Sequence, residues 1–94
     1  MAVEDLESHY FELMMSEPGT SLDTFLERAI AGEFGPQDAD TLVAFLRRVE
    51  RMILSSIQTR AAASPGAAED AERLAEDQRL HIADLVARGR RQAG

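Results

Sequence analysis

The sequence predicts a small all-α domain of three to four helices, either a helical bundle or an oligomeric helical hairpin with one long central helix. Three observations lead to this prediction. Apolar residues recur at helical spacing in four segments, glycine and proline separate the segments, and no run alternates β-branched with polar residues as a strand would. A chain of 94 residues has the size of one domain, which we place over residues 1–94.

The first two helices are expected at residues 3–16 and 21–34. The dipeptide Pro18-Gly19 follows the first segment and favours a turn. The second segment begins after Thr20, and glycine at position 32 or 35 closes it. Both segments have one apolar side, as expected of helices that cover a neighbour.

The other two helices are expected at residues 36–62 and 65–88, with a frayed tail at 89–94. The third would be about 40 Å long, and its apolar residues cover an arc of about 140°. One neighbouring helix cannot cover so wide a face. The fourth has a thin, alanine-rich stripe. Either the first two helices of the same chain cover the third helix, or the corresponding hairpin of a second chain does.

Composition excludes several classes of protein. Residues 1–40 contain ten acidic residues and one arginine, whereas residues 41–94 contain seven acidic residues and nine arginines. The acidic half repels a phosphate backbone, so we expect no nucleic-acid partner. A helix-turn-helix across residues 32–36 would present Asp38 and Asp40 to DNA, which is the wrong charge. With no cysteine, the chain has neither disulfides nor thiolate metal ligands.

We expect a cytoplasmic location and no membrane association. The apolar runs are far shorter than the ~18 residues of a membrane span, and the first residues are acidic where a signal peptide is basic. All ten basic residues are arginine, and lysine and asparagine are absent. This bias suggests a GC-rich, bacterial gene.

The two histidines are the candidates for chemistry. Each has an acid four residues before it and another three residues after it, and such positions share a helix face. Carboxylate and imidazole groups both bind divalent metals, but di-metal bundles use Glu-x-x-His, and here Leu6 and Gln78 occupy the glutamate positions. We therefore assign no metal and no cofactor, and retain as candidate ligands Asp5, His9 and Glu12, and Asp77, His81 and Asp84.

No catalytic motif is present, since there is no phosphate-binding glycine loop and no nucleophile in an elbow or cysteine context. We expect a non-enzymatic, acidic protein-interaction module: an adaptor, accessory subunit, immunity-like inhibitor or assembly factor that self-associates. The alternatives are a purely structural homo-oligomer subunit and a metal- or cofactor-binding bundle. The expected partner-binding residues are Leu42, Phe45, Leu46, Val49, Met52, Ile53 and Ile57, Met14 and Met15, and Arg47, Arg48 and Arg51.

Overall fold

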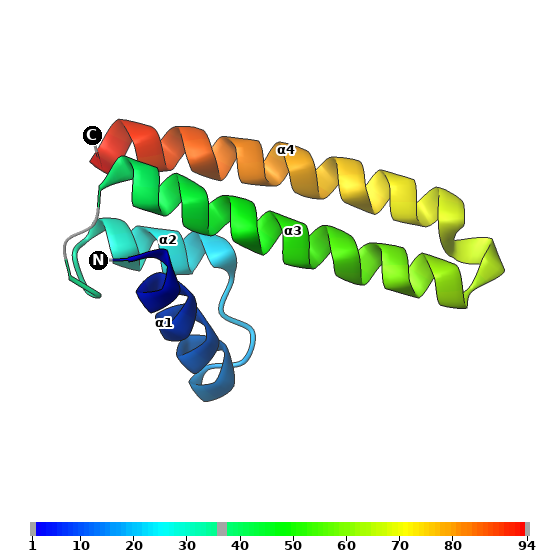
Figure 1. Cartoon of the computed structure of the whole chain (residues 1–94), viewed down its shortest axis with the longest axis horizontal. Helices are drawn as coiled ribbons and strands as arrows, with labels where there is room; N and C mark the ends of the chain where they lie inside the picture. The colour runs from blue at the N-terminus through cyan, green and yellow to red at the C-terminus, as the bar shows by residue number, and fades with distance from the viewer. Residues whose placement is uncertain (1, 36–37, 94) are drawn as a thin grey trace.

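The computed structural model describes residues 2–35 and 38–93, apart from the side chains of residues 65, 92 and 93. In this part of the chain the fold is all-α, which confirms the predicted fold class. Its elements are α1 (Val3–Ser16), α2 (Leu22–Ile30), α3 (Ala39–Ala63), the short 3₁₀ helix η1 (Pro65–Ala67) and α4 (Ala68–Ala93). Helices α3 and α4 form a long antiparallel hairpin, and α1 and α2 pack against the half of it that is remote from the turn (Figure 1).

Side-chain caps define where α2 and α3 begin. Ser21 accepts a hydrogen bond from the Thr24 backbone N–H (3.2 Å), and Asp38 accepts one from the Thr41 N–H (2.8 Å). Each cap satisfies a backbone donor that has no partner within the helix. The expected start of the third helix at residue 36 lies outside the described residues. The second helix is shorter than the expected 21–34, because Gly32 (φ 84°) turns the chain soon after residue 30.

The last helix is longer than expected. It continues to Ala93 instead of ending at residue 88. Gly89 is buried in it, and a Cβ atom added there would lie 3.9 Å from Leu42 Cβ. A glycine inside a helix costs about 1 kcal/mol. Gly89 packs against Leu42 and Leu26, and a Cβ atom there would make only ordinary van der Waals contacts with them. The contact with α3 therefore extends a helix that propensity alone would end.

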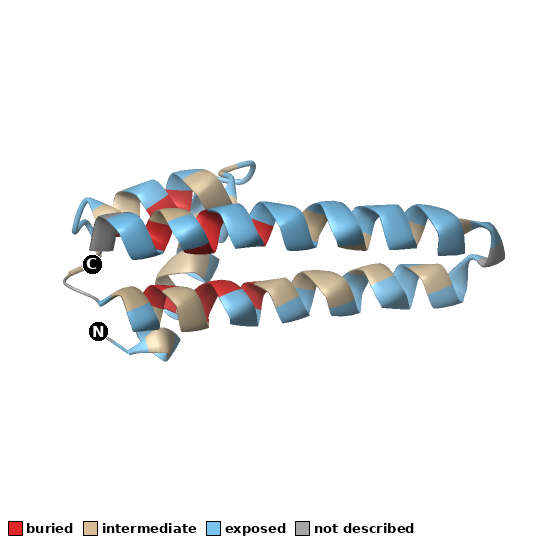
Figure 2. Cartoon of the chain, turned by 90° about the horizontal axis from the view of Figure 1, so that it is seen from above, coloured by how far each residue is buried: buried red, intermediate tan, exposed pale blue. Residues whose placement is uncertain are grey.

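The hydrophobic core lies entirely in the half of the hairpin that α1 and α2 cover (Figure 2). All four α-helices contribute to it. Phe25 is its centre: its ring lies 5.2 Å from those of Tyr10 and Phe45, and 5.0 Å from that of Phe34, centroid to centroid. The buried residues are Leu6, Phe25, Leu26, Ala29, Leu42, Phe45, Leu46, Val49, Ile82, Leu85 and Val86.

Beyond this core the hairpin extends uncovered. We call residues 39–53 and 78–93 its proximal half, and residues 54–77 the distal hairpin. No residue of the distal hairpin is buried among those whose side chains are described. Helix lengths explain the difference, because α1 and α2 have 14 and 9 residues whereas α3 has 25. At 1.5 Å per residue, α3 is about 37 Å long and α1 about 21 Å, so α1, lying across the end of the hairpin, cannot cover it.

Candidate functional site

An open apolar groove lies where α1 ends and the distal hairpin begins. It has a volume of about 450 Å³. Residues of α1, α3 and α4 line it, and most of them belong to α3. A smaller hollow of about 140 Å³, which shares Ile57, Arg60 and Leu74 with it, continues towards the turn. The apolar residues that define this open groove are Phe11, Met14, Met52, Ile53, Ile57 and Leu74.

Large apolar side chains are exposed mainly at this groove. Phe11 and Met14 are each 45% exposed, Met52 is 42% and Leu74 is 50% exposed. Exposed apolar residues scattered singly are ordinary, but a contiguous patch marks an interaction surface. Met15 (84% exposed) and Leu80 (62%) lie outside the groove. Met15 lies on α1 and Leu80 on α4, so they provide matched controls on two of the helices that line the groove.

Helical spacing positions the groove residues. Met52, Ser56 and Arg60 are four residues apart on α3, and Leu74 and Gln78 are four apart on α4, so each set lies on one helix face. The floor at Val49 and Ile53 is continuous with the core. The groove is therefore the uncovered extension of the core-facing side of the hairpin.

Polar groups at the groove are few. Tyr10 lines the groove, and partial burial raises the pKa of its hydroxyl above the usual value. Arg60 lines the groove, and Asp70 lines its extension. Within the described residues, neither Arg60 nor Asp70 forms an ion pair.

Ion pairs hold α1 on α3 beside the groove. Arg48 contacts Glu7 (2.6 Å) and Glu4 (3.7 Å). The hydrogen bond from Arg48 to the Glu7 carboxylate raises the pKa of the guanidinium. Arg47 contacts only Glu50, on its own helix (3.4 Å), and Arg51 has no ion pair in the described part of the chain. Of these three arginines, then, one anchors α1 and two lie on the outer side of α3.

The acidic residues of the first half are largely engaged within the chain. Arg28 bridges Glu17 and Glu33, which raises the pKa of Arg28 and lowers that of Glu33. Arg88 of α4 contacts Asp23 and Glu27 of α2, both at 3.9 Å. The acidic half therefore joins the helices of this chain more than it forms a free acidic surface.

The candidate metal ligands do not assemble. His9 stacks on Phe34, with 5.0 Å between ring centroids, and His81 Nε2 lies 2.7 Å from Asp23 Oδ1, between α4 and α2. Asp84 contacts Arg88 (3.3 Å). Asp5 accepts a hydrogen bond from the Ala2 N–H at the start of α1. No three His, Asp or Glu side chains in the described chain are placed to hold a metal ion together, Glu12 and Asp77 included.

The expected partner-binding residues fall into three groups. The first four of the long helix are buried in the chain's own core, and the last of them, Val49, also forms part of the groove floor. The second group, together with Met14, lines the open groove. Met15 and the arginines lie outside it. The buried group is Leu42, Phe45, Leu46 and Val49. The groove-lining group is Met14, Met52, Ile53 and Ile57, and the group outside the groove is Met15, Arg47, Arg48 and Arg51.

Sequence reasoning did not assign Phe11, Arg60, Leu74 or Gln78 to the site. Phe11 and Leu74 were visible as apolar residues at helical spacing, but their exposure depends on where α1 ends against α3, which periodicity does not give. A local signal exists only for Leu74, because it is the one large apolar residue of α4 between residues 68 and 79.

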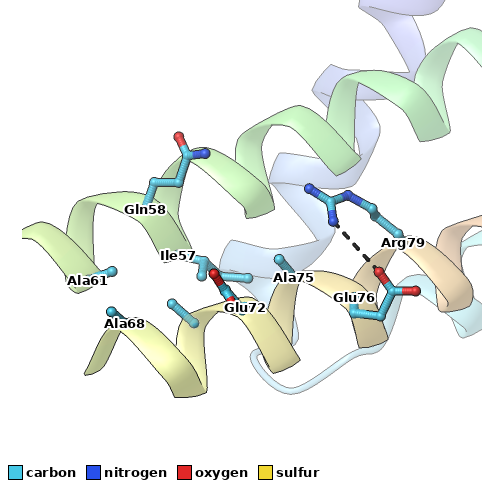
Figure 3. Close-up of a pocket in the computed structure, with 9 residues that line it drawn as sticks. Ile57, Gln58, Ala61, Ala68, Glu72, Ala75, Glu76 and Arg79 are labelled. Carbon is cyan, nitrogen blue, oxygen red and sulfur yellow. Dashed lines mark ion pairs between the residues drawn. The ribbon is translucent and has the colours of Figure 1, made fainter. Parts of the chain in front are cut away.

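A second depression, of about 610 Å³, lies along another face of the distal hairpin (Figure 3). Ala61, Ala68 and Ala75 line its floor, and the ion pair between Glu76 and Arg79 (3.7 Å) lies at its rim. Alanine side chains offer little apolar area to an occupant. This face is therefore less suited to docking than the open groove.

Comparison of the chain with protein-family models, with curated proteins and with solved structures finds no match in any of the three. None of the helices in the described part of the chain combines the length and apolar character that crossing a membrane requires.

Proposed function

We propose that this chain is a protein-interaction module that binds a helical partner through the open groove. One observation carries the proposal: Phe11, Met14, Met52 and Leu74, each between 42% and 50% exposed, surround a single groove that continues the core. In a chain of this size the exposed side of such a groove is costly unless a partner covers it.

The shape of the groove favours a helical segment with an apolar stripe. Helices line the groove, so the side-chain ridge of a helical segment can pack among their side chains. Methionines at positions 14 and 52 adapt to the shape of an incoming side chain. Adaptors, accessory subunits, inhibitors and assembly factors all use such surfaces. We place the module in the bacterial cytoplasm on the composition described above.

Affinity should depend on apolar contact more than on net charge. If the acidic first half carried binding, affinity would fall steeply between low and moderate salt, since exposed charges are screened. Many of those acids already pair within the chain. We therefore expect binding through the groove to survive moderate salt.

The test is capture by immobilised chain, with two matched variants. Leu74→Glu places a charge in the groove, and Leu80→Glu places the same charge on α4 outside it. The captured proteins, including a differently tagged copy of this chain, are identified by mass spectrometry. We expect capture by the wild type and Leu80→Glu that Leu74→Glu loses. The proposal fails if the wild type captures no protein, itself included, or if both variants lose capture equally.

A further inference from the structure

We propose that Met14 and Met52 are oxidation sites through which a peroxide releases the partner from the open groove. This inference rests on the proposed function, because it takes the open groove as the docking surface. Three features of the chain support it: methionine is its only source of sulfur, two methionines line one groove, and neither of these two belongs to the core.

Methionine is the only sulfur-containing residue in the chain. The sequence has four methionines and no cysteine, so no thiol competes for an oxidant. A methionine thioether takes one oxygen atom from hydrogen peroxide: the O–O bond breaks, a sulfur–oxygen bond forms and water leaves. Sulfur loses two electrons and the peroxide gains them. The product, methionine sulfoxide, is polar where the thioether was apolar, and reductases return it to methionine.

Two of these side chains are open to a small oxidant at the groove. Met14 of α1 and Met52 of α3 are each a little less than half exposed, and both line the open groove. Hydrogen peroxide is close to water in size, so it reaches both side chains while the groove is empty. A partner in the groove covers them and protects them from the oxidant.

Oxidation at these two positions alters the docking surface and spares the core. In the described part of the chain, the core and the partly buried apolar side chains packed against it include Tyr10 and Ile53, which also line the groove, but neither Met14 nor Met52. A sulfoxide on either methionine can therefore remain in water while the four helices stay packed. The reduced and the oxidised chain share one fold and differ in the polarity of the groove.

Burial of a sulfoxide beneath an apolar partner is unfavourable. The apolar stripe of a helical segment has no hydrogen-bond donor for the new oxygen atoms. A polar group that leaves water without gaining a hydrogen bond weakens binding by about tenfold or more. Oxidation of Met14 and Met52 should therefore release the partner, and reduction should restore binding.

Met15 provides a control on the same helix. It is 84% exposed and lies outside the groove, so it should oxidise at least as fast as Met14 with no effect on binding. Because Met14 and Met15 are adjacent, oxidation of either one has a similar effect on α1 itself. Only their places relative to the groove differ.

Peptide mass spectrometry after brief exposure to dilute hydrogen peroxide tests whether the sites are accessible. Met15 should gain one oxygen atom first, and Met14 and Met52 should follow while circular dichroism still reports the native helices. The inference is overturned if Met14 and Met52 gain no oxygen until the chain unfolds.

Sorting of partly oxidised wild type tests the effect on binding. The probe is an immobilised protein that the wild type captures and Leu74→Glu does not. Chains with a sulfoxide at Met14 or Met52 should pass through unbound, with affinity at least about tenfold lower. A sulfoxide at Met15 should be equally frequent in the bound and unbound chains. If sulfoxides at all three positions are distributed equally, the inference is wrong and the proposed function stands.

A pair of leucine substitutions tests whether these two thioethers are the cause. Leucine replaces methionine at similar volume, and it does not take oxygen from peroxide. The double variant Met14→Leu with Met52→Leu should bind the same probe as tightly after peroxide treatment as before it, whereas Met15→Leu should lose affinity as the wild type does. Equal losses in both variants would contradict the inference. If the wild type captures no protein that Leu74→Glu loses, the inference and the proposed function fail together.

Discussion

The proximal half and the distal hairpin are built from the same two helices, yet only one half has a core. In the proximal half, Leu42, Phe45 and Leu46 of α3 belong to the same core cluster as Ile82 and Leu85 of α4, and all are fully buried. In the distal hairpin the facing positions are mostly alanine, and no residue with a described side chain is buried. Two paired helices without a second layer thus bury almost no side chains.

The difference shows what α1 and α2 provide. A pair of helices has an interface only one side chain deep, and isolated helices are marginal in water. A second layer converts that interface into a core. The distal hairpin lacks this layer, so we infer that its order depends on continuity with the proximal half and on whatever covers the groove.

The largest expected effect contrasts the two halves directly. Phe45→Ala removes a fully buried ring and should destabilise the chain by about 3–5 kcal/mol. Ile57→Ala in the distal hairpin should cost less, about 1 kcal/mol, because Ile57 is only partly buried and no second layer of helices covers it. Chemical denaturation of both variants measures how much each substitution lowers the free energy of unfolding. Equal losses would mean that the distal hairpin is as well packed as the core.

The second prediction concerns the cap that starts α2. Ser21→Ala removes the acceptor for the Thr24 N–H and should cost about 1 kcal/mol. Ser21→Asp retains an acceptor and should preserve stability. A loss of the same size in both variants would show that the cap is not the cause.

The third prediction concerns the contacts between α2 and α4. Asp23→Asn weakens its contacts with His81 and Arg88, and partly exposed ion pairs contribute at most about 1 kcal/mol. Amide exchange should quicken in α2, with the distal hairpin unchanged. Faster exchange in residues 54–77 would contradict the separation of the two halves.

The smallest expected effect is a pH dependence at the start of α3. Hydrogen bonds from the Thr41 hydroxyl and N–H hold the pKa of Asp38 below its usual value. The contribution of the Asp38 carboxylate to folding stability is therefore present above the unfolded-state pKa of about 4. It is lost as the pH falls through the lower, folded-state pKa. Asp38→Asn keeps a capping acceptor but cannot titrate, so its Tm should fall less steeply in acid. Identical acid slopes would refute this.

The sequence predicted the helices well because each has its own periodic signal and punctuation. It could not show which part of the long third helix would remain open. Residues 42–49 and 52–57 belong to one apolar stripe, and only the lengths and docking positions of α1 and α2 divide it into a covered and an open part. The expected end of the fourth helix at residue 88 was wrong for a related reason: the packing of Gly89 against α3 is a tertiary contact that the local sequence does not show.

The candidate site was predicted in part. Met14, Met52, Ile53 and Ile57 were proposed for partner binding and line the groove. The acidic surface expected of the first half is instead largely paired with Arg28, Arg48 and Arg88. Charge counts reveal an excess of acid, but they do not reveal which acids already have partners within the fold.

Hydrogen–deuterium exchange of the wild type tests the central claim most directly. Amides of residues 54–77 should exchange faster than those of the proximal half, because no second layer of helices covers them. Equal protection of the two halves would contradict the account.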